Sequence, residues 1–453
     1  MAKSLIQGFF YGIMRLNYSG GNMKRKALEH MEKWKNSAGR KPLVLEGARQ
    51  VGKTWLMREF GRTCFEDVAE FNFDKSEALK AIFKNSKEVP YLIEQLSLIR
   101  GKAILPGKTL IIFDEIQECA EALNSLKYFK EDGSEYPIVS AGSLLGVYLA
   151  KGHSHPVGQV NIINIYPLSF EEFLEATDEA LYRYYGQITE RTMIEEIFHN
   201  RLNEAYQKYL IIGGLPECVQ AWVSTKDPAI VSERQKELQL VYERDFSKHN
   251  GKVNPARILM VFRNITAQLA KENNKFVYKN IQEGARARNF EEAVEWLVTA
   301  GVVHRLYLTQ KNEMPIKAFE DLSAFKLYLF DTGLLKHMAG IPNAQIILNS
   351  DFQFKGALAE NFVLQELKAL LSYEPKYFTF DRYEIDFVIQ DLHGDIIPIE
   401  VKSGESVSST SLNAYNSKYS PKLRIRYSML NLKRDGNLIN IPLYLVGKTA
   451  SLI

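Results

Sequence analysis

Short apolar runs alternate with longer amphipathic segments through the first third of the chain. Apolar residues dominate the stretches 42–46, 68–74, 109–115 and 136–142, and each has the character of a buried strand. Between them, apolar residues recur at helical spacing, and a helix is expected to begin near Lys53. Because strands that alternate with helices are typical of an α/β fold with a parallel sheet, we predict such a domain over residues 23–167.

The pattern changes after this first sheet. Residues 168–252 have mostly helical periodicity. Residues 253–320 contain two amphipathic helices followed by an apolar strand at 302–308, an order typical of a winged-helix unit. Residues 321–453 return to mixed α/β character, with short strands around a long helix at 356–371. We therefore expect a parallel-sheet domain, a helical and winged-helix-like middle, and a C-terminal α/β domain.

Residues 1–22 precede this pattern and are interpreted as an N-terminal extension. Their apolar run, Leu5 to Met14, is too short to span a bilayer, and no small-residue cleavage site follows it. Met23 is therefore the expected natural start. No other stretch is long and apolar enough to cross a membrane, so we expect no membrane partner.

The charge balance is nearly even. The chain has 453 residues with 57 Lys and Arg against 54 Asp and Glu, for a net charge of +3. General attraction to nucleic acid is therefore not indicated, and any DNA-binding face would be local. Cys64, Cys119 and Cys218 lie far apart, without the spacing of a zinc site or a disulfide framework. A reducing, cytoplasmic setting is the simplest expectation.

The strongest chemical signal is the segment G-A-R-Q-V-G-K-T at 47–54, which fits G-x-x-x-x-G-K-[ST] without a mismatch. Its glycines permit backbone N–H groups to face phosphates, Lys53 reaches the β- and γ-phosphates, and the Thr54 hydroxyl binds Mg²⁺. The helix that follows presents its positive end to the anion. No N-K-x-D segment for reading guanine is present, so ATP with Mg²⁺ is expected. The predicted binding residues are Gly47, Ala48, Arg49, Gln50, Val51, Gly52, Lys53 and Thr54.

A strand ending in two carboxylates, T-L-I-I-F-D-E at 109–115, is the expected partner of this loop. Asp114 is predicted to hold the hydration shell of Mg²⁺, and Glu115 to orient and activate the attacking water. The alternative is that the two carboxylates merely form a polar turn at the end of the strand. The G-x-x-x-x-G-K-T segment about sixty residues upstream favours the functional interpretation. Ser143 is the first candidate for sensing the γ-phosphate and Ser140 the second, although a solvated serine in a turn explains either position equally well.

Charged residues also interrupt the apolar pattern near the C-terminus. Glu360 lies on the long helix, Asp386 lies inside an apolar strand, and Glu400 and Lys402 share the next strand. Glu360, Asp386 and Glu400 are candidate ligands of one divalent metal. Asp386, Glu400 and Lys402 are candidate catalytic residues, with Lys402 activating water or stabilising phosphate charge. The open alternative is an ion pair of Lys402 with one of these acids, in a domain that does not cleave.

Five motifs in order resemble a large family of uncharacterised bacterial and archaeal ATPases of the AAA superfamily: G-A-R-Q-V-G-K-T, F-D-E-I-Q, A-G-S-L-L-G, Y-P-L-S-F-E-E-F-L and G-G-L-P-E. The resemblance runs from residue 23 to about residue 450. It implies an AAA-type ATPase domain joined to a domain with a restriction-endonuclease-like, PD-(D/E)xK core. Many relatives carry Gly-Arg before P-L-S-F, where this chain has Gly158 and Gln159. An arginine finger is therefore missing at that position, and Arg49 and Arg244 are the alternatives.

These observations predict an ATPase whose C-terminal, nuclease-like domain binds or cleaves DNA. The alternative is an ATP-gated switch in which a catalytically dead nuclease fold binds a protein partner or a second copy of the chain. A helicase-like translocase is disfavoured, because no second motor domain is recognisable.

Overall fold

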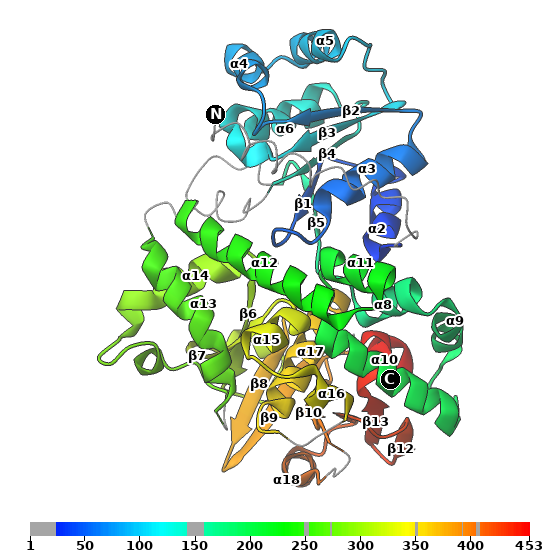
Figure 1. Ribbon diagram of the computed structural model, residues 1–453, viewed down its shortest axis with the longest axis vertical. Coiled ribbons are helices and arrows are strands. Elements are labelled where there is room, and N and C mark those ends of the chain that lie inside the picture. Colours follow the sequence, from blue (N-terminus) through cyan, green and yellow to red (C-terminus); the bar gives the residue numbers. More distant parts are fainter. Residues whose placement is uncertain are drawn as a thin grey trace.

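The computed structural model describes residues 24–142, 158–248, 253–271, 274–348, 352–391, 393–404 and 408–453. In Figure 1 an α/β domain lies at the top, and the remaining helices and a second sheet form a larger lower part. The long helix α12 (Pro228–Lys248) runs across the junction between the two. No helix in the described ranges combines the length and the apolar character that a membrane span requires.

The upper domain contains a sheet of five described strands, all parallel, in the order β2-β3-β4-β1-β5. Four of them confirm the sequence prediction, and the fifth, β5, was not foreseen. The strands are β1 (Leu43–Glu46), β2 (Asp67–Asn72), β3 (Thr109–Asp114), β4 (Ile138–Ala141) and β5 (Asn161–Asn164). β5 alternates half-buried and exposed residues, so its apolar pattern is weak.

Two sets of helices belong to different apolar cores of this domain. The helices α2 (Lys26–Lys35) and α3 (Lys53–Cys64) share the core that continues into the lower part of the molecule. A separate core lies on the other side of the sheet. Its helices are α4 (Glu77–Asn85), α5 (Val89–Arg100) and α6 (Ala120–Asp132), and the short 3-10 helix η1 (Ile116–Glu118) precedes α6.

The middle region is helical, as predicted, and it is tied closely to the C-terminal part. Its helices are α8 (Phe170–Thr177), α9 (Glu179–Gln187), α10 (Glu196–Ile212), α11 (Pro216–Thr225) and α12. The glycines of the G-G-L-P turn after α10 have no room for side chains, because a Cβ at Gly214 would lie 2.1 Å from the carbonyl oxygen of Leu168. The buried carboxylate of Asp331 accepts the N–H of Gly214 at 2.7 Å. This contact joins the middle region to the lower sheet.

The lower sheet has eight described strands in the order β12-β13-β11-β10-β9-β8-β6-β7. Helices α13 (Pro255–Leu269) and α14 (Ala287–Thr299) and strand β6 (Val303–Thr309) lie where the winged-helix-like unit was expected, with the 3-10 helix η2 (Tyr278–Asn280) between the helices. Because β6 also pairs with β8, this unit and the C-terminal domain share one sheet across residue 320. The other strands are β7 (Glu320–Leu329), β8 (Lys376–Phe380), β9 (Tyr383–Gln390), β10 (Ile396–Val401), β11 (Arg424–Ser428), β12 (Lys433–Asp435) and β13 (Leu438–Pro442).

Helix α17 (Lys355–Leu370) is the predicted long helix, and it packs against the last segment of the chain, the 3-10 helix η4 (Leu443–Lys448). This segment returns to the middle region. Tyr444 and His199 share a hydrogen bond of 2.8 Å, and Lys448 donates to the carbonyl of Ile188 at 2.7 Å. The shorter helices are η3 (Ile316–Phe319), α15 (Thr332–Met338), α16 (Asn343–Ile347), α18 (Thr410–Tyr419) and α19 (Thr449–Leu452).

Candidate nucleotide site

The loop between β1 and α3 has the backbone geometry of a phosphate-binding loop. Gly47, Gln50 and Gly52 have φ angles of 146°, 63° and 92°, in the region that favours glycine. A Cβ at Gly47 would lie 2.2 Å from the carbonyl oxygen of Ile165 at the end of β5. Glycine is therefore required there both by conformation and by space.

The Lys53 side chain is folded back onto this loop. It is buried, and its Nζ donates to the carbonyl oxygens of Gly47 at 2.9 Å and Ala48 at 2.7 Å. Burial lowers the pKa of Lys53 to about 8, while the carboxylates of Glu115 and Asp114 oppose that shift. The ammonium group thus lies at the loop with neutral acceptors that an anionic ligand can replace.

Thr54 and Asp114 meet beside the loop, as the sequence predicted. The Thr54 hydroxyl lies 3.2 Å and 3.3 Å from the two carboxylate oxygens of Asp114, and Asn72 Nδ2 donates to Asp114 Oδ2 at 3.2 Å. Burial, followed by the charge of Glu115, raises the pKa of Asp114 above its usual value. A hydroxyl and a carboxylate in contact are the oxygen donors that Mg²⁺ uses in such sites, so these residues fit the ion. Asn72, from the neighbouring strand β2, was missed because no local motif marks it.

Glu115 follows β3 with a left-handed backbone, at a φ of 51°. Its carboxylate accepts a hydrogen bond of 2.7 Å from Gln117 Nε2. A non-glycine residue in this conformation is uncommon and often lies at a functional site. Of the two sensor candidates, Ser140 is buried and donates to the carbonyl of Leu43 at 3.1 Å, so it joins β4 to β1. Ser143 lies outside the described residues.

Arg25, the residue before α2, is hydrogen-bonded to the loop and was not identified from the sequence. Its guanidinium donates to the carbonyl of Val51 at 3.0 Å and to that of Tyr166 at 2.7 Å. It also forms a buried ion pair of 3.0 Å with Glu172, which caps α8 in a capping box with Ser169. The loop, β5 and the middle helices are therefore connected through one arginine.

Arg49 has a partner within the same chain. Its guanidinium forms an ion pair with Asp245 of α12, and its carbonyl accepts a hydrogen bond of 2.7 Å from the Tyr242 hydroxyl. The structure therefore gives no support to Arg49 as an arginine finger, because the guanidinium of a finger must contact the transferred phosphate and that of Arg49 is paired with Asp245. Arg244, the other alternative, is exposed.

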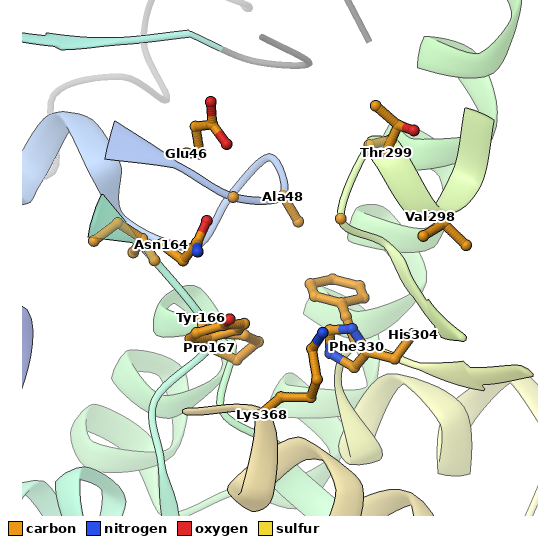
Figure 2. A pocket seen from close by; sticks show the side chains of 14 residues that line it. Glu46, Ala48, Asn164, Tyr166, Pro167, Val298, Thr299, His304, Phe330 and Lys368 are labelled. Atoms are coloured by element: carbon orange, nitrogen blue, oxygen red, sulfur yellow. The ribbon is translucent and has the colours of Figure 1, made fainter. Parts of the chain in front are cut away.

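A cavity of about 230 Å³ lies beside the start of the loop, between the upper domain and the lower sheet. Figure 2 shows Tyr166, His304, Phe330 and Lys368 gathered at the end away from Glu46 and Thr299. Burial lowers the pKa of His304 to about 3, so this imidazole is neutral. The start of the loop thus borders a space that the upper domain, the winged-helix-like unit and the C-terminal region line.

A second group of charged side chains, the C-terminal acidic cluster, lies on the lower sheet. It consists of Lys326, Glu360, Glu384, Asp386, Glu400 and Lys402. Lys326 was not predicted. Its side chain is 1% exposed, and its Nζ lies 2.6 Å from Glu384 and 4.0 Å from Glu360. Glu360 also accepts hydrogen bonds from Tyr328 at 2.7 Å and Asn274 at 3.0 Å.

The predicted residues of β9 and β10 are neighbours within this cluster. Asp386 accepts the N–H of Val401 at 2.7 Å, and Glu400 lies 2.9 Å from the Nζ of Lys402. Burial, followed by the charge of Glu360, raises the pKa of Asp386 to about 8, and Lys326 opposes that shift. The other Glu400 oxygen is buried and accepts no hydrogen bond from the described residues.

Within the described parts of the chain, no three His, Cys, Asp or Glu side chains converge so that they could hold a metal ion. Glu360, Asp386 and Glu400 therefore lie in one cluster without forming a three-ligand group, and Lys326 already supplies a cation to it. Metal binding by these three acids stays a prediction, and the present arrangement does not fit it well.

Three segments of the chain match known protein families. Residues 39–174 match an AAA domain, whereas residues 203–345 and 355–445 match two domains of unknown function, DUF8612 and DUF4143. No curated protein matches the chain.

Several solved structures are similar to the chain. A Walker-type ATPase of Pyrococcus abyssi is 15% identical, with a TM-score of 0.43 over 70% of this chain and 95% of that one. The ORC1 protein of Aeropyrum pernix, in complex with DNA, is 13% identical, with a TM-score of 0.29 over 71% and 92%. The RuvB Holliday junction branch migration motor of Thermotoga maritima is 13% identical, with a TM-score of 0.31 over 73% and 96%. The family match and the loop geometry together identify the N-terminal region as an AAA-like P-loop domain with a parallel sheet.

Proposed function

We propose that the N-terminal domain binds ATP with Mg²⁺ and hydrolyses it. The observation that carries this proposal is the convergence of Lys53, Thr54 and Asp114 at the end of the loop, with Glu115 next to them. These residues come from a loop, a helix and a strand that meet at the carboxyl edge of a parallel sheet, where ligands bind in open α/β folds.

Each side chain has a role that its position supports. Lys53 exchanges the carbonyls of Gly47 and Ala48 for phosphate oxygens, which strengthens the attraction because phosphate is charged. Thr54 and Asp114 hold Mg²⁺, which supplies positive charge to the phosphates, and Asn72 keeps Asp114 in place. Glu115 orients the attacking water and accepts its proton.

The test is ATP binding and phosphate release by the full chain and by Lys53→Met. We expect turnover by the wild type and a loss of at least about 100-fold in the variant, since electrostatic groups of this kind contribute that much. Lys108→Met removes an exposed lysine of the same domain and serves as the matched control. A wild-type protein that neither binds nor hydrolyses ATP, or a variant with unchanged turnover, would overturn the proposal.

A second candidate function is metal-dependent cleavage of nucleic acid by the C-terminal acidic cluster. The observation in its favour is the buried Glu400 oxygen without a hydrogen-bond donor beside Lys402. Such an oxygen destabilises the fold by about 1–3 kcal/mol unless a cation or a donor meets it. The observation against it is Lys326, whose ammonium already neutralises part of the cluster.

Plasmid and oligonucleotide cleavage with Mg²⁺ or Mn²⁺, with and without ATP, separates the two interpretations of this domain. Cleavage that disappears in Lys402→Ala but persists in Lys422→Ala, an exposed lysine of the same domain, would establish a nuclease. ATP turnover without any cleavage would instead support the ATP-gated switch, in which the domain binds a protein partner.

A further inference from the structure

Helix α12 contacts the phosphate-binding loop through two residues on one face. Tyr242 and Asp245 are three positions apart, so they lie side by side on the helix. Both are buried, at 1% and 6% exposure, although α12 crosses the junction between the two parts of the molecule. They belong to the segment Y-E-R-D-F-S-K-H, which the proposed chemistry does not use.

Both residues bind the same loop residue, Arg49. The Tyr242 hydroxyl donates to the Arg49 carbonyl oxygen at 2.7 Å, and Asp245 Oδ1 pairs with the Arg49 guanidinium. The other oxygen of Asp245 is buried and accepts no hydrogen bond from any described residue. A buried carboxylate is costly without its cation, so Asp245 depends on Arg49 remaining in place.

The loop is thereby restrained at four of its carbonyls. Tyr242 binds that of Arg49, Arg25 binds that of Val51, and Lys53 binds those of Gly47 and Ala48. Of these contacts, only those of Lys53 are expected to be replaced by contacts with phosphate oxygens when a nucleotide binds. Because Tyr242 and Arg25 donate to carbonyl oxygens, these two contacts occupy none of the backbone N–H groups of the loop and fix where they lie.

The same face of α12 continues into the winged-helix-like unit and the lower sheet. The ring of Tyr242 packs against Phe330 with centroids 5.5 Å apart, and that of Phe246 packs against Phe262 and Trp296 at 5.0 Å and 5.4 Å. Gly301, just after α14, lies so close to the loop that a Cβ on it would be 3.1 Å from the Ala48 nitrogen. A shift of the loop therefore has to move α12 or these neighbours.

We propose that Tyr242 and Asp245 are positioning residues that hold the phosphate-binding loop in its nucleotide-accepting shape and transmit its state to the winged-helix-like unit through α12. This inference rests on the proposed nucleotide binding. It assigns Arg49 to a contact within the chain, in place of a role toward a neighbouring subunit. Because the contacts shape the loop before any chemistry occurs, their loss weakens nucleotide binding more than it slows turnover.

The test compares Asp245→Arg, Arg49→Asp and the double variant with both changes. We expect each single variant to raise the Kd for ATP at least about tenfold with kcat changed less than about threefold. The exchanged pair should return the Kd to within about threefold of the wild type, because the opposite charges meet again. Glu243→Gln, on the same helix but paired with Arg263, is the matched control.

Two measurements keep the outcomes separable. Thermal unfolding shows which variants are folded. If an Asp245 variant is unfolded, Tyr242→Phe, which removes only one hydroxyl, provides a milder change. Wild-type protein that binds no ATP would end the proposed function itself. Folded variants of Asp245 and Tyr242 that bind ATP as tightly as the wild type would overturn this inference alone, as would a double variant without recovery.

The transmission along α12 has its own readout, which is amide hydrogen exchange with and without ATP. In the wild type, ATP is expected to slow exchange in α12, α13 and α14, and in Tyr242→Phe this protection should remain confined to the upper domain. Equal protection of α13 and α14 in both proteins would contradict the transmission.

Discussion

Two groups of lysine and carboxylate side chains occur in this molecule, and they are built on different partners. In the nucleotide site, Lys53 donates to backbone carbonyls, while Asp114 contacts Thr54 and Asn72. In the C-terminal acidic cluster, Lys326 binds the Glu384 carboxylate directly at 2.6 Å. The first lysine is therefore held by neutral groups, and the second by opposite charges.

The pKa values follow this difference. Burial lowers the pKa of Lys53 to about 8, because nearby carboxylates compensate it only in part. Burial also acts on Lys326, but Glu360 and Glu384 more than offset it and raise the pKa above the usual lysine value. A buried ammonium group without a carboxylate in direct contact is suited to bind an anionic ligand. An ammonium group that is already paired with carboxylates instead stabilises the fold around it. In this molecule, the buried lysine whose hydrogen-bond partners are neutral is therefore the better candidate for binding a ligand.

The largest effect is expected for Glu115→Gln. The amide cannot accept the proton of the attacking water, so ATP turnover should fall by about 10²–10⁴-fold. The Kd for ATP should stay within about threefold, because Glu115 acts after binding. Phosphate release and equilibrium binding measure the two quantities, with Glu131→Gln, an exposed residue of the same domain, as the control. Turnover above a third of the wild-type rate would mean that another group activates water.

The next effect concerns the cation of the acidic cluster. Lys326→Met leaves Glu360, Glu384 and Asp386 without their buried partner, so the free energy of unfolding should fall by about 3–5 kcal/mol. Lys402→Met should cost less than Lys326→Met, because the Lys402 side chain is 33% exposed and solvent screens part of its pair with the buried Glu400. Denaturant unfolding compares the two. Equal losses would show that Lys326 is not the main counter-charge.

A pH dependence of stability is predicted for Glu366 on α17. Burial raises its pKa from 4.5 to about 7, and the N–H of Phe170, which donates at 2.9 Å, only partly offsets this. Since the folded pKa is the higher one, this contribution is complete below about pH 4.5 and is lost as the pH rises through 7. Between pH 5 and 8 the wild type should lose about 2–3 kcal/mol relative to Glu366→Gln. Parallel stability curves for the two proteins would refute the assignment.

The smallest effect should appear in nucleotide affinity at alkaline pH. Because the pKa of Lys53 in the free protein is about 8, the affinity for ATP should be constant at lower pH and should fall above it, by up to about tenfold per pH unit. Titrations between pH 7 and 9.5 test this, with Lys53→Arg as a variant whose charge does not change in that range. A flat profile in the wild type would place its pKa well above 8.

The sequence located the residues of the proposed nucleotide site better than it located the surroundings of that site. Gly47 to Thr54 are contiguous, and their strand and helix context is local, so composition and spacing suffice to locate them. Asn72, Arg25 and Asp245 approach the loop from elements that are distant in sequence, and no local pattern marks such contacts. Tyr242 and Asp245 lie in a charged helical segment, and their role follows only from the direction in which α12 runs past the loop.

In the C-terminal region, the secondary structure was predicted better than the composition of the acidic cluster. Helix α17 and strands β9 and β10 were placed correctly, and their three acids do lie in one cluster. Lys326 could not be predicted to join them, because it comes from β7 at the far edge of the sheet order. The strand β5 was missed because half of its residues are exposed, so its apolar pattern is weak.

The return of η4 to the middle helices has a consequence for how the protein is made. Residues 443–448 leave the ribosome well after the middle region, yet Tyr444 and Lys448 contact His199 and Ile188, which were synthesised some 250 residues earlier. The upper sheet can form while translation continues, but α9, α10 and α17 keep apolar surface exposed until η4 has been synthesised. A protein truncated before residue 443 would therefore be destabilised in its middle helices as well as at the site of truncation, and quality-control proteases would cleave it there.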